Sequence, residues 1–293
     1  MQPELPDVFT AAQALAAGLS RNQLRGGRFR PVCRGVYTTG DPADLMVRAK
    51  AALLVAGPGT MLGGVTVLIM CGVWLPQALL DDTRIHVVIP PRRVGPEMGF
   101  IKATRSCLTL HPMEFGDVLG VHPAQAWLQM ATQLSKTDLI VAADSLMRRK
   151  ATLATRDEIE KVVAHHAGGR GVALARGALR LARAGVESPM ETRLRLAIVA
   201  AGLECPLVDY PFQPLPHAKE YRFDMAYPAQ QLAVEYDGSI HADPLKMRDD
   251  RTRRRLLEDA GWRIITATAS DLPDFTSVVA SVRAALAVNR PQV

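Results

Sequence analysis

Residues 222–238 read RFDMAYPAQQLAVEYDG, and this stretch decides the fold of the C-terminal part of the chain. Its two apolar runs, 222–228 and 231–238, are separated by Pro228-Ala229-Gln230, which is typical of two strands joined by a tight turn. We therefore expect the two strands to pair as a hairpin. Glu235 and Asp237 are two residues apart on the second run, so their side chains should point to the same face of the sheet.

The flanking sequence predicts a layered α/β domain around this hairpin. Ser188 and Pro189 are typical of the start of a helix, which should extend to residue 201. Residues 206–213 form a further predicted strand, and MRDDRTRRRLLEDAG (247–261) a basic helix. WRIITATA (262–269) predicts another strand, and residues 274–288 a last helix. The order α-β-β-β-α-β-α places helices on a mixed sheet, and Gly185 marks its boundary with the preceding region.

The N-terminal residues predict a winged helix-turn-helix. Residues 9–17 and 20–27 read as two short helices, beginning at Thr10 and Ser20, and RFRPVCRGVYTTG (28–40) reads as a basic two-stranded ribbon. In such a unit the second helix enters the major groove of DNA and the ribbon contacts phosphates. The expected groove contacts are Arg21, Asn22, Gln23 and Arg25, and the expected backbone contacts are Arg28, Arg30 and Arg34.

Length and composition support an ordinary globular protein of more than one domain. The chain has 293 residues, 48% hydrophobic and 22% charged, which excludes a disordered chain and a collagen-like fibre. We expect a winged-helix region at 1–80, a mixed α/β region at 81–185 and the C-terminal α/β domain at 186–293. The overall class is therefore α/β, or α+β when the whole chain is considered.

Charge is divided unevenly between the two halves of the chain. The net charge is +6, but residues 1–186 contain 22 Lys and Arg against 14 Asp and Glu, whereas residues 187–293 contain 13 against 15. The N-terminal half is therefore expected to meet a polyanion. The four cysteines are far apart and form no CxxC pair, which argues against a structural zinc site.

Residues 51–80 contain no charged side chain and are long enough to cross a bilayer. Gly57-Pro58-Gly59, Gly63-Gly64 and Pro76 interrupt this segment, so a buried helical hairpin is expected rather than a membrane helix. The sequence contains neither a P-loop nor a GxGxxG motif, so no nucleotide cofactor is expected. With no signal peptide at the N-terminus, a cytoplasmic location is the simplest expectation.

Four acids fall on separate predicted elements of the C-terminal domain: Glu191, Asp224, Glu235 and Asp237. Carboxylates inside apolar strands are costly to bury without a compensating charge. A divalent cation would supply that charge, and Mg²⁺ prefers such oxygen ligands. Neighbouring strands lie about 4.8 Å apart, so Asp224 and Glu235 can share one ion if their strands pair. The alternative interpretation is a solvated sheet edge on which these acids only cap helices and turns.

The C-terminal 100 residues resemble the very-short-patch-repair (Vsr)-like branch of the PD-(D/E)XK nuclease superfamily, a restriction-endonuclease-like α/β sandwich. The similarity lies in Asp224, then Glu235-Tyr236-Asp237-Gly238, a histidine, and the block from Asp250 to Arg263. The resemblance implies Mg²⁺ or Mn²⁺ held by Asp224, Glu235 and Asp237, with Glu191 as the helical acid. It also implies His241 as a general base or phosphate contact, and Arg251, Arg254 and Arg255 as phosphate contacts. Asp237 stands where the superfamily pattern has lysine, and the Vsr-like branch also lacks that lysine.

The first 40 residues resemble the N-terminal winged helix of AbiEi-type antitoxins and transcriptional regulators, through ALAAGLS (14–20) and RGVY (34–37). This resemblance implies binding to the operator of a toxin–antitoxin gene pair. Two functions follow from the two resemblances. The first is a DNA-binding protein with a Mg²⁺-dependent endonuclease domain. The second is a regulator or type IV antitoxin whose nuclease-like domain is inactive.

Overall fold

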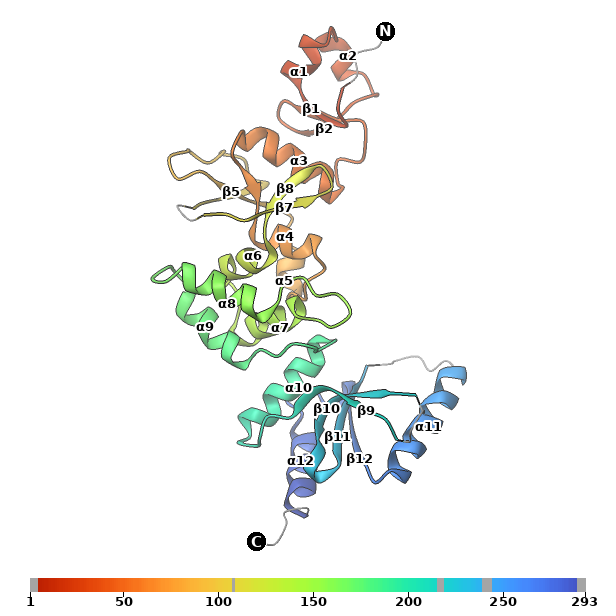
Figure 1. Cartoon of the computed structure of the whole chain (residues 1–293). Helices are drawn as coiled ribbons and strands as arrows, with labels where there is room; N and C mark the ends of the chain where they lie inside the picture. Colours follow the sequence, from red (N-terminus) through yellow and green to blue (C-terminus); the bar gives the residue numbers. More distant parts are fainter. Residues whose placement is uncertain (1–4, 107–108, 215–218, 239–243, 289–293) are drawn as a thin grey trace. The chain divides into compact units, whose positions relative to one another are not determined.

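The computed structural model describes residues 5–106, 109–214, 219–238 and 244–288, without the side chains of 244–251. The chain forms two compact units, one of residues 1–134 with 158–175 and one of residues 135–157 with 176–293. Within the described residues there are twelve α-helices and three sheets, which confirms the predicted α/β class (Figure 1). The three sequence-based regions, divided at residues 80 and 185, stay a prediction.

The first unit begins with a helix-turn-helix and a ribbon. Strand β1 (Val8–Thr10) leads into α1 (Ala11–Ala16) and α2 (Arg21–Arg25), followed by β2 (Arg30–Cys33) and β3 (Val36–Thr38). The strands form an antiparallel sheet in the order β1-β3-β2. Thr10 and Ser20 cap the two helices through capping boxes, as the sequence predicted for their starts. The buried rings of Phe9 and Phe29 meet edge to face, 5.3 Å between centroids, and pack the helices on the sheet.

A mixed five-stranded sheet follows in the order β6-β5-β4-β8-β7. Its strands are β4 (Met61–Leu62), β5 (Ile85–Ile89), β6 (Ile101–Arg105), β7 (Pro112–Phe115) and β8 (Val118–Val121). Helices α3 (Leu45–Ala56), α4 (Gly64–Met70), α5 (Gln77–Leu80) and α6 (Pro123–Gln129) accompany them. Farther along the chain come α8 (Arg156–His165) and α9 (Val172–Leu181).

The uncharged segment 51–80 is therefore divided among several short elements. It contains the end of α3, strand β4, then α4 and α5, so the expected helical hairpin is interrupted by a strand. Met61 and Leu62 pair with β5, which draws this part of the segment into the sheet. Among the helices of the described residues, none combines the length and the apolarity that a membrane crossing requires.

The second unit contains a four-stranded sheet in the order β12-β11-β10-β9. Strands β9 (Leu207–Phe212), β10 (Tyr221–Tyr227) and β11 (Leu232–Asp237) are antiparallel, and β12 (Arg263–Thr268) runs parallel to β11. Helices α10 (Pro189–Ala200) and α12 (Thr276–Val288) pack against one face, and α11 (Pro244–Asp259) packs against the other (Figure 1). The predicted hairpin and the predicted order of elements are confirmed.

A buried ion pair fixes α10 against α7 (Lys136–Leu146) in this second unit. Asp144 of α7 accepts from the guanidinium of Arg195 at 2.6 Å and from the Thr192 hydroxyl at 2.8 Å. It also accepts from the backbone N–H of Arg183 at 2.7 Å, so the buried carboxylate is fully surrounded by donors. These contacts set the position of the helix that carries Glu191.

Candidate functional site

Asp224 lies on β10 and is the most perturbed acid of the predicted cluster. Its Oδ2 accepts a hydrogen bond from the backbone N–H of Tyr236 on β11 at 2.8 Å. Burial, followed by the nearby charges of Glu191 and Glu235, raises the pKa of the Asp224 carboxyl to about 7. The Tyr236 N–H and Arg253 act in the opposite direction but only partly offset this rise. Asp224 is thus held among like charges, as the sequence predicted.

Glu235, on β11, forms a two-pronged ion pair with Arg253 of α11. The guanidinium donates to Oε2 at 3.1 Å and, through its other terminal nitrogen, to Oε1. Arg253 also donates to the carbonyl of Arg222 at 3.3 Å and lies 6.0 Å from the ring centroid of Tyr221. Both oxygens of one expected metal ligand therefore already have a positive partner.

Arg253 was not among the expected site residues, and the sequence does contain a signal for it. It precedes the fully buried Leu257 by four residues, so the two share the face of α11 that packs on the sheet. An arginine on the sheet-facing side of a helix favours an acidic partner on the sheet, and the half-buried Glu235 is that partner. The neighbouring arginines make the whole helix look like a charged, exposed surface. The charge pattern of the sequence therefore does not distinguish Arg253 from them.

One cavity of about 480 Å³ gathers three of the predicted acids. Asp224, Glu235 and Asp237 line it together, although Asp237 is exposed and Glu235 is half-buried. Arg222, Arg253 and Arg254 form another part of the wall, together with Thr266 of β12. Ile264 adds an apolar surface. Acids and arginines thus share one hollow, which suits a phosphate group neutralised by cations.

Glu191 approaches Asp224 from α10 but also serves its own helix. Ser188 caps α10 by accepting from the Glu191 N–H at 3.2 Å, and the Glu191 Oε2 accepts from the Glu187 N–H at 3.0 Å. Burial raises the pKa of the Glu191 carboxyl, against the effect of these hydrogen bonds. The predicted start of this helix is confirmed. Glu191 therefore has the helix-capping role of the alternative interpretation, and it also raises the pKa of Asp224.

The fit to a metal ion depends on two carboxylates. Within the residues that the structure describes, no three His, Cys, Asp or Glu side chains are grouped closely enough to hold a metal ion. Mg²⁺ often needs only one or two protein carboxylates, with water and substrate completing its octahedron. Asp224 and Glu235 fit that requirement. The charge of Glu235 raises the pKa of Asp224, and a bound cation would offset the repulsion between the two carboxylates. Glu235 must first be released from Arg253.

Several predicted contacts have other partners or fall outside the described part. Arg254 pairs with Glu258 at 2.9 Å, and Arg255 lies 3.9 Å from Asp259, both within α11. His241 and the side chain of Arg251 lie outside the described residues.

The predicted DNA-contacting residues of the first unit all lie at its surface. Arg21, Asn22, Gln23 and Arg25 are exposed on α2, and Arg28, Arg30 and Arg34 are exposed on or beside the ribbon. Gln23 is partly occupied, since its side-chain oxygen accepts from the Ser20 N–H at 2.7 Å as part of the cap. The guanidinium of Arg28 also lies 5.3 Å from the ring centroid of Phe29. The exposure of all seven side chains is what a groove-and-backbone contact requires.

The chain is similar to two proteins of Mycobacterium tuberculosis. It is 30% identical over 252 residues to Uncharacterized protein MT2308 and to Uncharacterized protein Rv2248, from two strains of Mycobacterium tuberculosis. The matched region covers 85% of this chain and 89% of each relative, so the chain belongs to the same family. No family model matches the sequence, and no solved structure matches it.

Proposed function

We propose that the protein binds DNA through its N-terminal helix-turn-helix and cleaves phosphodiester bonds with its C-terminal domain. The carrying observation is Asp224, a half-buried carboxyl whose pKa rises to about 7 beside Glu191 and Glu235, in a cavity that arginines also line. Perturbed carboxyls in a cavity with cationic walls are typical of sites that handle phosphate esters. DNA is the proposed partner and the cytoplasm the proposed location, with the operator of a toxin gene as one candidate target.

Each residue has a defined part in this proposal. Asp224 and Glu235 would hold Mg²⁺ or Mn²⁺, which supplies an activated water and neutralises charge at phosphorus. Arg222 and Arg254, on the wall of the same cavity, would orient the phosphate through charge-assisted hydrogen bonds. Asp237 lies at the exposed edge, within reach of solvent and of a water that approaches the phosphate.

The direct test is nicking of supercoiled plasmid DNA by the full chain with Mg²⁺ or Mn²⁺. We expect metal-dependent nicking that Asp224→Asn abolishes, because asparagine still accepts from Tyr236 but cannot neutralise a cation. Asp259→Asn is the matched control, since Asp259 is an exposed acid of the neighbouring helix. Nicking that survives Asp224→Asn would assign the activity to another site.

A second function is favoured by the Arg253–Glu235 pair and by the aspartate at position 237. An arginine that permanently neutralises Glu235 leaves no need for a metal, and the domain would then serve binding or assembly. The protein would be a transcriptional regulator or type IV antitoxin. Sequence-specific DNA binding by a chain that never nicks DNA with Mg²⁺ or Mn²⁺ would establish this second function over the first.

A further inference from the structure

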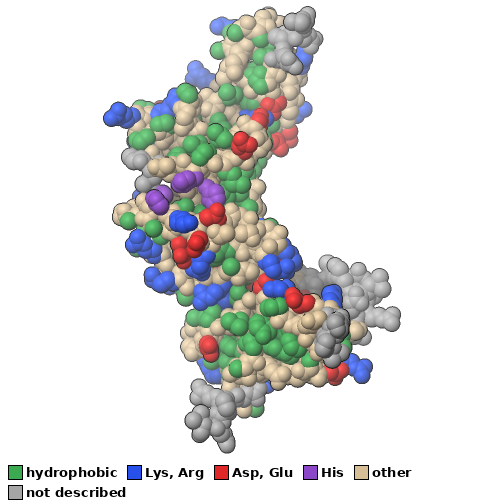
Figure 2. All heavy atoms as spheres, viewed as in Figure 1, with side chains coloured by type: hydrophobic (Ala, Val, Ile, Leu, Met, Phe, Trp, Pro, Cys, Tyr) green, Lys and Arg blue, Asp and Glu red, His purple; other side chains and the backbone are tan. Residues whose placement is uncertain are grey.

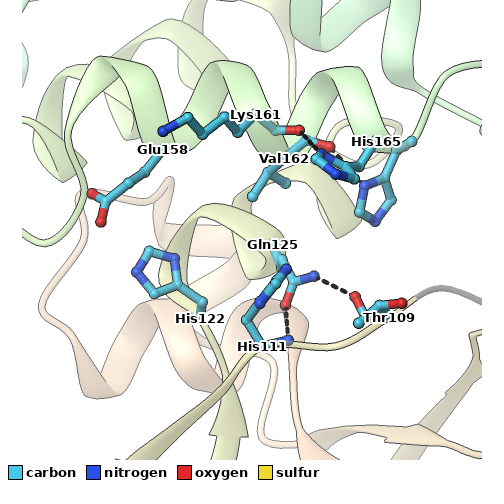
Figure 3. A pocket seen from close by; sticks show the side chains of 9 residues that line it. Thr109, His111, His122, Gln125, Glu158, Lys161, Val162 and His165 are labelled. Carbon is cyan, nitrogen blue, oxygen red and sulfur yellow. Dashed lines mark hydrogen bonds between the residues drawn. The ribbon is translucent and has the colours of Figure 1, made fainter.

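A second cavity, of about 500 Å³, lies in the first unit and has no part in the proposed nuclease site. One wall is a single face of α8, formed by residues 158, 161, 162, 165 and 166, which recur at helical spacing. The opposite wall comes from His122 and Gln125 of α6 and from Thr109 and His111 (Figure 3). Four of the seven histidines of the chain thus surround one hollow.

The polar side chain at the floor of this cavity already has its hydrogen-bond partners within the protein. The buried amide of Gln125 donates to the Thr109 carbonyl at 3.0 Å and accepts from the His111 N–H at 2.8 Å. Val162, buried on α8, supplies an apolar surface beside it. Recognition must therefore come from the side chains on the wall, chiefly the imidazoles and Lys161.

The backbone of α8 orients the two histidines at its C-terminal end, His165 and His166. Nδ1 of His165 lies 2.8 Å from the Lys161 carbonyl oxygen, and Nδ1 of His166 lies 2.7 Å from that of Val162. Because a carbonyl only accepts, each Nδ1 carries a proton, so Nε2 is the nitrogen left for a ligand: it accepts in the neutral ring and donates to an anion when the ring is protonated. Such pre-orientation lowers the cost of ordering these side chains on binding.

His122 is oriented the other way. Its Nδ1 accepts from the Ala124 N–H at 3.3 Å, so in the neutral ring the proton is on Nε2, which can donate. Burial lowers the pKa of His122, and the neighbouring His111 lowers it further, against the effect of Glu158. An anion bound beside this imidazole would oppose that lowering.

These features favour an anionic molecule over a metal ion. Among the described residues no three potential ligands converge on one point, so the imidazoles surround a volume rather than a single atom. Four imidazoles and one ammonium face a single carboxylate, Glu158. Histidine side chains gather at the surface of this region beside Lys or Arg and acidic side chains, so the cavity is open to solvent (Figure 2). A tetrahedral anion accepts hydrogen bonds in several directions, as these walls require.

We propose that this cavity binds a small phosphorylated molecule, with its phosphate at the end formed by His111 and His165. The cavity volume fits a molecule the size of a mononucleotide. The rest of the molecule would lie over Val162 and toward Glu158, which accepts from a hydroxyl or amino group (Figure 3). The inference is independent of the nuclease site, because every lining residue belongs to the first unit.

The test uses inorganic sulfate, which keeps its charge between pH 6 and pH 8, with inorganic phosphate as a second probe. Isothermal titration of the full chain at pH 6 should show sulfate binding, because the imidazoles and Lys161 can donate to an anion between the cavity walls. The double substitution His165→Gln/His166→Gln should weaken it about tenfold at pH 6, the loss expected for charge-assisted hydrogen bonds. Arg170→Gln/Arg176→Gln is the control, since both exposed arginines lie outside the cavity wall.

Sulfate binding that the histidine substitutions leave unchanged would overturn the proposal. An equal loss in the arginine control would also overturn it, because the effect would then be one of net charge. A short DNA duplex provides the third arm. If the histidine substitutions weaken duplex binding while sulfate binding stays unchanged, the imidazoles serve the DNA backbone and no small-molecule site exists.

Discussion

Both carboxylate oxygens of Glu235 accept from the guanidinium of Arg253, Oε2 from one terminal nitrogen at 3.1 Å and Oε1 from the other. The pair joins β11 to α11 across the cavity that also contains Asp224. Arg253 thus stands where a metal ion would supply positive charge. Metal binding at Asp224 and Glu235 must compete with this arginine.

Replacing Arg253 by glutamine should therefore strengthen metal binding. We expect Arg253→Gln to bind Mn²⁺ about tenfold more tightly than the unchanged protein in isothermal titration without DNA. The metal-free variant should also melt at a lower temperature, because Glu191, Asp224 and Glu235 lose a compensating charge. Arg254→Gln is the control, since its ion pair within the described residues is with the exposed Glu258. Equal Mn²⁺ affinity in all three proteins would contradict competition at Glu235.

Asp224 should make the stability of the metal-free protein fall as pH rises. Its pKa is about 7 in the folded chain against an ordinary value of 3.8, so the folded state binds more protons between these values. The contribution of Asp224 to stability is then greatest below about pH 4 and decreases until pH 7 is passed. Asp224→Asn removes this dependence, and urea unfolding at pH 8 should show a gain of about 1–3 kcal/mol. Asp237→Asn, at an exposed acid of the same cavity, serves as control.

A variant that is more stable but inactive is the result expected for a functional residue that the fold keeps at a cost in stability. A loss of stability at pH 8 in Asp224→Asn would show that the carboxylate is compensated in the folded protein. The raised pKa, and with it the main support for a cation site, would then be wrong.

The exposed arginines of the ribbon should supply DNA affinity without sequence preference. Arg28→Ala/Arg30→Ala should weaken binding to specific and random duplexes alike and lower the salt slope by about one for each phosphate that the ribbon no longer neutralises. Arg176→Ala is the control, because Arg176 is exposed on α9, away from α2 and the ribbon in the sequence. Fluorescence anisotropy over a range of salt concentrations measures both quantities. An unchanged salt slope in the double variant would remove the ribbon from the interface.

The fold was largely predictable because its signals are local. Ser188-Pro189 begins α10, Thr10 and Ser20 begin the two N-terminal helices, and the Pro228 turn joins β10 to β11, all through short-range chemistry. The strand β4 was missed because two residues, Met61 and Leu62, form it, and only their pairing with β5 defines it. Such pairing depends on residues more than 20 positions away, which no local pattern contains.

The candidate site was only partly predictable for the same reason. The register of β10 with β11 brings Asp224 near Glu235, as the hairpin implied. Arg253, the partner of Glu235, is 18 residues away on a helix. The charge pattern of that helix shows four arginines close together and does not indicate which of them faces the sheet. The histidine cavity combines α6, α8 and residues 109–111, so its members are separated by up to 57 positions. His165 is the last residue of α8 and His166 follows it, so nothing local in the sequence connects them with residues 109–125.

The buried pair of Arg195 and Asp144 should dominate the stability of the second unit. Arg195→Leu leaves Asp144 buried without its guanidinium, and we expect a loss of about 3–5 kcal/mol in urea unfolding at pH 8. Burial already raises the pKa of Asp144, so the loss should shrink as the pH falls and the carboxyl takes up a proton. Arg193→Leu is the matched control, because Arg193 pairs with Asp138 at 2.6 Å on the same two helices but is partly exposed, and should cost at most about 1 kcal/mol. Equal losses in the two variants would mean that burial does not distinguish these ion pairs and that α10 is positioned by its apolar contacts alone.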